Sequence, residues 1–332
     1  MHTITREQVA AKLRELNLYL SPAISYRLET LFPRVEGWFV KGRIKDQVKL
    51  IQRLEPLLTE ILLVHEEVQL VVKCNQSTLA DVFLTGSIWI ETTTYNLLVF
   101  SNLRVLCIRV DDKGVPLKTY WQIYYNQINK MQHTLFGNAR LFLRDGTKLI
   151  YTGIPIEDRD RMQETVQENR DLFRNKGFAP AVTQSREQLC GHCYDVIPPG
   201  VYECECCGAT YWRPAEVGVR SLIFPSWGDF VMQHHMLAIM ELFGFVLLLW
   251  FTSAAFSEGK YGTGLTVFFM ANLADALMSV QIATRALHLK SVPLWEDFQC
   301  QKPFDWEQVQ FVKSDARSDY TGYQAAAFAD EL

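Results

Sequence analysis

The sequence has no overall excess of basic residues. Its 332 residues include 33 Lys and Arg against 37 Asp and Glu, which gives a formal net charge of -4. A chain with a pI near 6.0 lacks the basic field typical of nucleic-acid-binding proteins, so we expect no nucleic acid among its partners. The first residues also lack a long apolar run after their basic residues, and we therefore expect no secretory signal peptide.

The sequence also lacks the common signatures of catalysis. It contains no phosphate-binding loop, no glycine-rich dinucleotide turn and no pattern that pairs a nucleophile with a base. Histidine is scarce, with seven residues, and the spacing of His65, His133 and His288 indicates no partner for any of them. We therefore expect a protein that is not an enzyme.

Residues 1–64 have the pattern of a small helical region. Thr5 and Gln8 have the spacing of a capping box at the start of a first helix. A longer helix is predicted by apolar residues that recur at helical spacing. These residues are Val48, Ile51, Leu54, Leu57, Leu58 and Leu62.

Residues 65–175 have the pattern of an antiparallel β unit followed by a helix. Short segments rich in β-branched and aromatic residues are separated by turn signals such as Asp145-Gly146. The sequence predicts a closing helix over 157–175 and, before it, a barrel or sandwich. The expected strands are Val68–Val72, Ser87–Thr92, Leu97–Phe100, Val105–Val110, Thr119–Ile123, Lys130–His133, Arg140–Leu143 and Lys148–Tyr151.

Two segments of this region resemble the pleckstrin-homology (PH) superfamily in its bacterial, GRAM-like branch. Leu97–Leu106 is similar to the family's strand, Asn-x-Arg turn and strand, and Trp121–Ile128 is similar to its Tyr-x-x-Ile segment. The resemblance implies an antiparallel PH-like β-barrel with a C-terminal helix; the alternative is another small antiparallel barrel. The first loop of the barrel, Cys74–Thr78, has no Lys or Arg, so we expect no specific phosphoinositide binding.

After a linker predicted at 176–189, two CxxC pairs predict a metal site in residues 190–214. Cys190 and Cys193 form one pair, and Cys204 and Cys207 form the other, with ten residues between the pairs. Four thiolates match the tetrahedral coordination of Zn²⁺ and leave no position for a catalytic water, so we expect a structural zinc. The segment resembles a zinc ribbon.

Alternatives to a zinc ribbon also follow from this segment. The quartet could hold rubredoxin-like iron and carry electrons, or the four cysteines could be free and buried. Cys206 would be a spare cysteine, and His192 a substitute ligand or a surface residue. Four of the eight cysteines form the two CxxC pairs, and the others are scattered along the chain. This pattern is typical of metal binding in a reducing compartment, so we expect reduced cysteines rather than a disulfide framework.

Residues 236–290 contain two apolar segments that predict a transmembrane hairpin. Met236–Phe256 and Gly262–Thr284 are each long enough to cross a hydrocarbon core, and a short turn joins them. The alternative is a buried helical hairpin in a soluble protein.

The predicted spans contain the polar residues Glu241, Asn272 and Asp275. Asn272, Asp275 and Ser279 share a helix face, and such polar residues at membrane depth face protein or water. They could form an ion or proton path, or a packing contact between helices or subunits.

Residues 215–235 form an apolar approach to the first span, where Phe224 and Trp227 suit the membrane interface. With the hairpin, this approach resembles small two-helix bacterial membrane modules, although Ser226 stands where those modules have Gly. The tail, 291–332, shows no clear period, and we expect it to be mostly flexible.

Positive residues flank the predicted hairpin on the same side of the membrane. Arg213 and Arg220 precede the first span, and Arg285 and Lys290 follow the second. The positive-inside rule therefore predicts that both termini are in the cytoplasm. The resemblance to bacterial modules implies that the membrane is the bacterial inner membrane. We expect a membrane-anchored adaptor or scaffold that binds another protein or itself. The alternatives are an oligomeric channel or transporter subunit and an iron-binding electron carrier.

Overall fold

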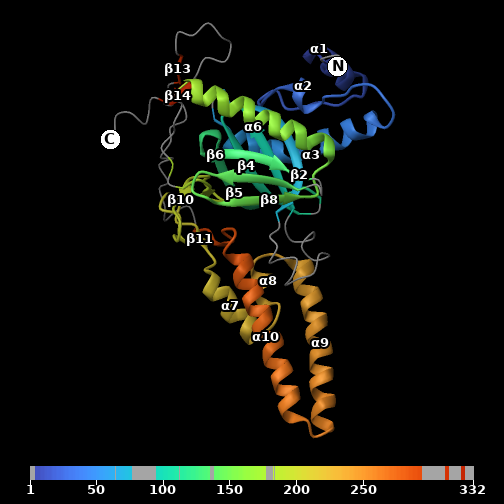
Figure 1. Cartoon of the computed structure of the whole chain (residues 1–332), viewed down its shortest axis with the longest axis vertical. Coiled ribbons are helices and arrows are strands. Elements are labelled where there is room, and N and C mark those ends of the chain that lie inside the picture. Colours follow the sequence, from blue (N-terminus) through green and yellow to red (C-terminus); the bar gives the residue numbers. More distant parts are fainter. Residues whose placement is uncertain are drawn as a thin grey trace. The chain divides into compact units, whose positions relative to one another are not determined.

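The computed structural model describes residues 4–63, 65–76, 95–111, 113–134, 138–176, 182, 184–293, 311–313 and 323–325. The chain combines helices with an antiparallel sheet (Figure 1). It divides into two compact units. The sheet unit comprises Met1–Gln76, Tyr95–Leu189 and Gln301–Leu332, and the hairpin unit comprises Ser77–Thr94 and Cys190–Cys300.

The sheet unit begins with helices that pack on the sheet. At the first helix, the predicted capping box is present: the Gln8 amide donates to Thr5 Oγ1, and Gln8 Oε1 accepts from the Thr5 amide at 2.9 Å. Strand β1 then pairs in parallel with β2, so residues before 64 belong to the same unit as the sheet. The elements are α1 (Arg6–Glu15), β1 (Ser25–Tyr26), α2 (Leu28–Leu31) and α3 (Val40–Ile61).

Strands that follow form an antiparallel sheet in the order β9-β5-β4-β3-β2-β8-β7-β6. Their bounds are β2 (Glu67–Gln76), β3 (Tyr95–Ser101), β4 (Arg104–Val110), β5 (Pro116–Tyr124), the 3-10 turn η1 (Tyr125–Gln127), β6 (Ile128–His133), β7 (Ala139–Leu143), β8 (Lys148–Thr152) and β9 (Glu187–Leu189). The predicted strands correspond to β2 through β8, except Ser87–Thr92, which lies outside the described residues.

The sheet is not the closed barrel that the sequence favoured. Among the described residues, no pairing joins β6 to the other end of the sheet. Within the described residues, β2 pairs with β8 at two positions, Asn75 with Thr152 and Gln76 with Tyr151. Helix α6 (Ile156–Lys176) packs on β2, η1 and β6 instead of a further strand, and its buried residues Met162 and Val166 face this contact.

The predicted linker at 176–189 is partly a strand, because β9 pairs antiparallel with β5. In the tail, β13 (Phe311–Lys313) and β14 (Tyr323–Ala325) pair with each other. The rest of the tail beyond 293, where the sequence predicts flexibility, lies outside the described residues.

A buried ion pair explains the Ser-Asn-Leu-Arg motif between β3 and β4. The Arg104 guanidinium donates to Glu66 at 2.9 Å, to the Ile61 carbonyl at 2.7 Å and to the Gln122 side chain. Ser101 Oγ donates to Glu66 at 2.6 Å and accepts from the Arg104 amide at 3.0 Å. The motif therefore joins the end of α3 to the centre of the sheet.

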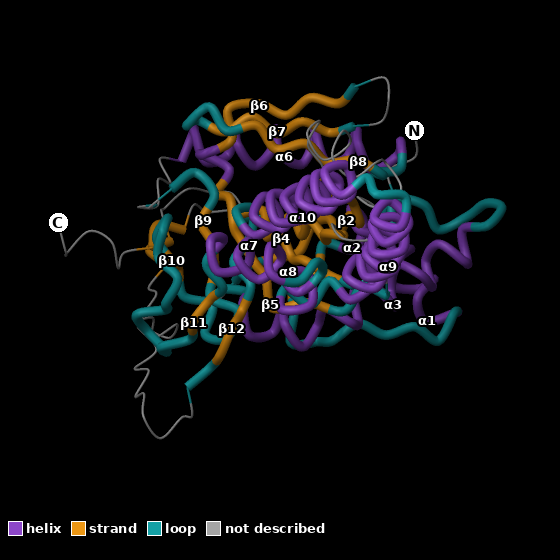
Figure 2. Tube along the Cα trace, turned by 90° about the horizontal axis from the view of Figure 1, so that it is seen from below, coloured by secondary structure: helices purple, strands orange, loops and turns teal. Residues whose placement is uncertain are grey.

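In its described residues, the hairpin unit combines small strands with four helices. Its elements are β10 (Val196–Ile197), β11 (Thr210–Tyr211), α7 (Pro214–Ile223), α8 (Trp227–Val231), α9 (His235–Ser257), α10 (Tyr261–Ala283) and β12 (Leu289–Ser291). Helix α10 packs on α7 and α9, and α8 packs on α7 and α9 (Figure 2). The predicted interfacial segment is therefore two short helices joined by a bend.

Candidate metal centre and polar helix cluster

The first CxxC pair forms a tight turn that directs two sulfurs to one side. The Tyr194 amide donates to the Cys190 carbonyl at 3.1 Å, and the Cys190 amide donates to the Asp195 carbonyl at 2.7 Å. The turn ends in a left-handed residue, because Tyr194 has a φ of 65°. This chain reversal places Cys193 close to Cys190.

The second pair repeats this geometry. The Gly208 amide donates to the Cys204 carbonyl at 2.8 Å, and the Cys204 amide donates to the Ala209 carbonyl at 2.8 Å. Gly208 has a φ of 66°, which glycine adopts without steric cost. The two turns therefore present Cys204 and Cys207 as a matching pair opposite the first.

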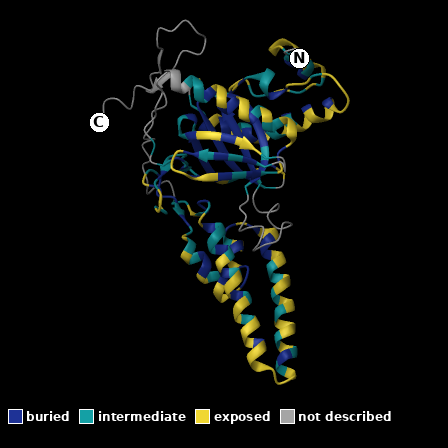
Figure 3. Ribbon diagram, viewed as in Figure 1, coloured by how far each residue is buried: buried dark blue, intermediate teal, exposed yellow. Residues whose placement is uncertain are grey.

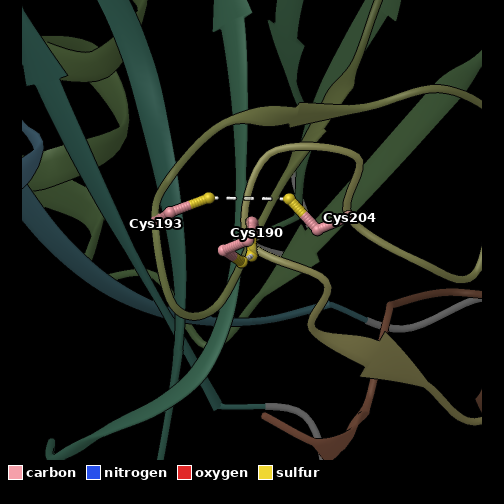
Figure 4. A group of neighbouring side chains, drawn as sticks. Cys190, Cys193 and Cys204 are labelled. Carbon is pink, nitrogen blue, oxygen red and sulfur yellow. Dashed lines mark hydrogen bonds between the residues drawn. The ribbon is translucent and has the colours of Figure 1, made fainter. Parts of the chain in front are cut away.

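The four sulfurs are arranged to hold one metal ion. The sulfurs of Cys190 and Cys207 are 3.6 Å apart, and those of Cys193 and Cys204 are 3.5 Å apart (Figure 4). All four lie within 4.8 Å of one another. A tetrahedron of sulfurs around Zn²⁺ has edges of about 3.8 Å, since the Zn–S distance is about 2.3 Å. The quartet therefore fits a single four-coordinate ion.

Further donors surround the sulfur of Cys190. The Tyr211 hydroxyl donates to this sulfur at 3.0 Å and accepts from the Gly191 amide at 2.8 Å. Hydrogen bonds from the Cys193 and Cys204 thiols, and then from Tyr211, hold the pKa of Cys190 well below its usual range. A thiolate is the form that binds metal, so the protein favours the ligand state at this position.

Two residues near the quartet are not part of it. His192 is outside the group of metal-ligating side chains. Cys206 is also outside the group and is in a disulfide. The expectation that every cysteine is reduced is therefore wrong at Cys206, although Cys206 is indeed spare with respect to the metal.

The two cysteine turns, residues 190–211, form a metal knuckle. This knuckle packs on the chain segment that leaves α10. Leu287 belongs to the same buried cluster as the metal-ligating cysteines, and Leu289 packs against that cluster. Strand β11 pairs with β12, and the Trp212 amide donates to the His288 carbonyl at 2.9 Å. The metal site thus lies where the chain enters α7 and where it leaves α10.

Helices α9 and α10 coincide with the two predicted spans to within about one residue at each end. Both are long and apolar enough to cross a membrane, with mean hydropathy of 2.0 and 1.5. Only 11% of the apolar window in α9 and 17% of that in α10 is buried (Figure 3). A core hairpin of a soluble protein would be mostly buried, so this exposure disfavours that alternative.

The structure brings two of the three predicted intramembrane polar residues together. Glu241 of α9 interacts with Asp275 of α10. Asn272 is buried, but its side-chain amide donates to the Phe268 carbonyl one turn earlier, at 3.0 Å. The Asn272 amide therefore bonds within its own helix, while Glu241 and Asp275 form a contact between helices.

A buried network surrounds this contact, and the sequence predicts only Ser279 of its members, on the helix face of Asp275. Ser279 Oγ donates to Asp229 Oδ2 at 3.0 Å and lies 2.8 Å from Ser221 Oγ. His234 Nδ1 lies 3.3 Å from Asp229 Oδ1. A lone aspartate inside the apolar run before the first span was the available signal, because a charge there must be buried with partners or exposed at the interface.

Glycine permits the close approach of these helices. A Cβ at Gly228 would lie 2.4 Å from Ser221 Oγ, and a Cβ at Gly218 would lie 2.4 Å from Val280 Cγ2. Both distances are far below van der Waals contact, so α7, α8 and α10 can pack this closely only with glycine at both positions.

The two predicted interfacial aromatics are partly exposed beside α7. Phe224 is 41% exposed and Trp227 is 43% exposed. The Phe224 ring meets the Phe245 ring edge-on at 5.6 Å, and the Arg220 guanidinium lies 5.8 Å from the Trp227 ring. Aromatic rings beside a cation are typical of a membrane interface.

Comparison with known proteins shows no family for this chain. No family model matches. No curated protein sequence matches either. The C-terminal domain of an unknown protein from Leishmania infantum is similar over 40% of this chain and 97% of that chain, with 11% identity and a TM-score of 0.23. The linker-DH/PH domains of p115-RhoGEF are similar over 40% of this chain and 43% of that chain, with 6% identity and a TM-score of 0.25.

Proposed function

We propose that this protein is a membrane-anchored adaptor whose sheet unit presents a binding surface for another protein or for a second copy of the chain. Helices α9 and α10 span the membrane in this proposal. The observation that carries the adaptor function is a pair of adjacent, exposed aromatic side chains. Trp38 is 91% exposed and Phe39 is 82% exposed in the segment between α2 and α3.

The backbone presents these two aromatic residues to solvent. Phe39 has a φ of 64° and Gly37 a φ of 122°, so the chain turns sharply just before α3 begins. Val40, the first residue of α3, is buried and anchors the turn to the unit. Exposed Trp and Phe on an anchored turn are typical of interface anchors, since large rings bury much area at a low entropic cost.

The metal is zinc with a structural role in this proposal. Four protein sulfurs would fill all four positions of a tetrahedral ion, and a thiolate set suits zinc or iron. Packing of the cluster on Leu287 and Leu289 supports a role in holding the hairpin unit together.

The sheet unit is PH-like or GRAM-like in this proposal, and the hairpin lies in a bacterial inner membrane. The antiparallel strand order with α6 after the last hairpin supports the first point. Positive residues beside both membrane-proximal ends, including Arg220 and Lys290, support cytoplasmic termini.

A photo-crosslinking experiment tests the adaptor function in intact membranes. A benzoylphenylalanine in place of Trp38 should give one discrete adduct, either with another protein or with a second copy of the chain. The same probe in place of Tyr19, which is 66% exposed in the same unit, serves as the matched control and should give no such adduct. Equal or absent crosslinking at the two positions would refute the proposed surface.

A further inference from the structure

Three carboxyl side chains from different helices meet inside the hairpin unit. Asp229 belongs to α8 and is fully buried, Glu241 belongs to α9, and Asp275 belongs to α10. Glu241 interacts with both of the other carboxyls. The cluster thus lies where α8, α9 and α10 pack on one another.

Glu241 has no donor to stabilise a negative charge. Both of its carboxylate oxygens are closed off from solvent, and within the described residues neither accepts a hydrogen bond. The charged groups that act on Glu241 are Asp229 and Asp275, which have the same sign. Burial, missing donors and like charges all disfavour the ionised carboxylate.

The serine side chains and amides near the cluster make hydrogen bonds to groups other than Glu241. The Ser226 amide donates to Asp275 Oδ2 at 3.3 Å, and Ser221 and Ser279 bond to each other. Ser226 is itself fully buried, and its hydroxyl is unpaired in the described structure. This unpaired, buried hydroxyl belongs to the residue whose backbone amide donates to Asp275.

The titratable and cationic groups around the cluster contact either Asp229 or aromatic rings. From the start of α9, His234 contacts Asp229 and its ring meets the His288 ring at 5.4 Å. His235 packs its ring against that of Phe230. From α7, the Arg220 guanidinium lies over the rings of Trp212 and Trp227. A positive charge on His234 would act on Asp229 and leave Glu241 beside carboxylates.

We propose that Glu241 is a buried proton-binding site, which carries a proton at neutral pH and donates it to Asp229 or Asp275. The bound proton removes one negative charge from the cluster. It also converts the carboxyl of Glu241 from an acceptor with no donor into a donor beside two acceptors. This inference does not depend on the adaptor function.

The proton holds α9 against α8 and α10. In the unfolded chain this carboxyl releases its proton as pH rises, whereas in the folded chain it keeps the proton. The folded protein therefore loses stability relative to the unfolded chain as pH rises. Loss of the proton would place like charges together at the contact of the three helices. Proton release therefore loosens the attachment of α9.

Thermal unfolding of the full chain in detergent micelles tests this site. Glu241→Gln imitates the protonated carboxyl, so this variant should match the wild type at mildly acidic pH, and its advantage in Tm should grow as pH rises. Glu258→Gln removes an exposed carboxylate from the turn between α9 and α10 and should show no such trend. A Glu241→Gln variant that is less stable than the wild type at neutral pH would overturn the proposal.

Infrared spectroscopy gives an independent readout. The wild type should show the C=O stretching band of a protonated carboxyl at neutral pH; Glu241→Gln should lose the band and Glu258→Gln should retain it. Persistence of the band in Glu241→Gln, or its absence from the wild type, would refute the assignment. Stabilisation of the wild type by Na⁺, Mg²⁺ or Ca²⁺, compared with choline at equal ionic strength and lost in Glu241→Gln, would show a cation site instead.

Discussion

Arg104 shows how one residue connects a sequence motif to the tertiary structure. The motif around it predicts only a strand, a turn and a strand. In the folded chain its guanidinium is buried, with 4% of the side chain exposed, and it pairs with Glu66, whose side chain is fully buried. The Ile61 carbonyl at the end of α3 also accepts from it. A polar residue in a motif can therefore be a core residue when its partners come from distant segments.

Replacement of Arg104 should destabilise the sheet unit strongly. Arg104→Met keeps the length of the side chain but leaves the Glu66 carboxylate buried without its cation, which costs about 3–5 kcal/mol. Arg43→Met breaks an exposed pair with Glu157 and should cost less than about 1 kcal/mol. Guanidinium unfolding of the detergent-solubilised chain, followed by circular dichroism, measures both values. Equal effects of the two variants would contradict this assignment.

Individual elements follow from composition more readily than their contacts do. The lengths of α9 and α10 are evident from apolar runs, and the strands from segments rich in β-branched and aromatic residues that turns separate. The packing of α7 on α10 requires Gly218 beside Val280, a pairing between segments 62 positions apart in the numbering. The pairing of β11 with β12 likewise joins the metal knuckle to the end of the hairpin. These contacts decide how the knuckle acts on the helices.

Removal of the metal should release the junction between β11 and β12. The knuckle's core includes Leu287, so the loss of four metal–sulfur bonds exposes this segment and weakens the bond from the Trp212 amide to the His288 carbonyl. Hydrogen exchange at the Trp212 amide should accelerate by about tenfold for each 1.4 kcal/mol of local stability lost. Exchange at the Val99 amide in the sheet unit should stay unchanged.

A pair of cysteine variants separates metal loss from general damage to the knuckle. Cys193→Ser removes a ligand and should reproduce the exchange pattern of the chelated protein. Cys206→Ser lies in the same turn as Cys204 and Cys207 but outside the quartet; it removes the disulfide at Cys206, yet it should retain one metal per chain. Metal loss in Cys206→Ser would show that the ligand set is different.

At the scale of the whole molecule, the sheet unit buries an apolar core, whereas the helices of the hairpin unit leave much of their apolar surface exposed. In the sheet unit, apolar residues of the strands are buried, whereas Leu247 and Leu277 of the hairpin are 52% and 60% exposed. Exposed apolar helices of this length are unfavourable in water, and lipid removes that cost.

The intact chain should therefore sediment with membranes after alkaline carbonate washing and require detergent for release. Leu247→Arg together with Leu277→Arg places two charges on exposed faces, each adding about 2.5–3.5 kcal/mol to the free energy of insertion, and should move protein to the supernatant. Glu258→Arg changes only the turn between the helices and should stay in the pellet. Wild-type chain in the supernatant without detergent would contradict the membrane assignment.

The sequence by itself determined the local features of this protein: the capping box at Thr5, the strands, the apolar spans and the cysteine quartet. Each depends on residues near one another in the chain, where periodicity, propensity or ligand spacing is enough. The tertiary structure alone decided that the sheet stays open over the described residues and that Cys206 is in a disulfide. It also decided that Asp229, from outside the spans, joins Glu241 and Asp275. Burial and long-range contacts set these outcomes, and no short window of sequence contains that information.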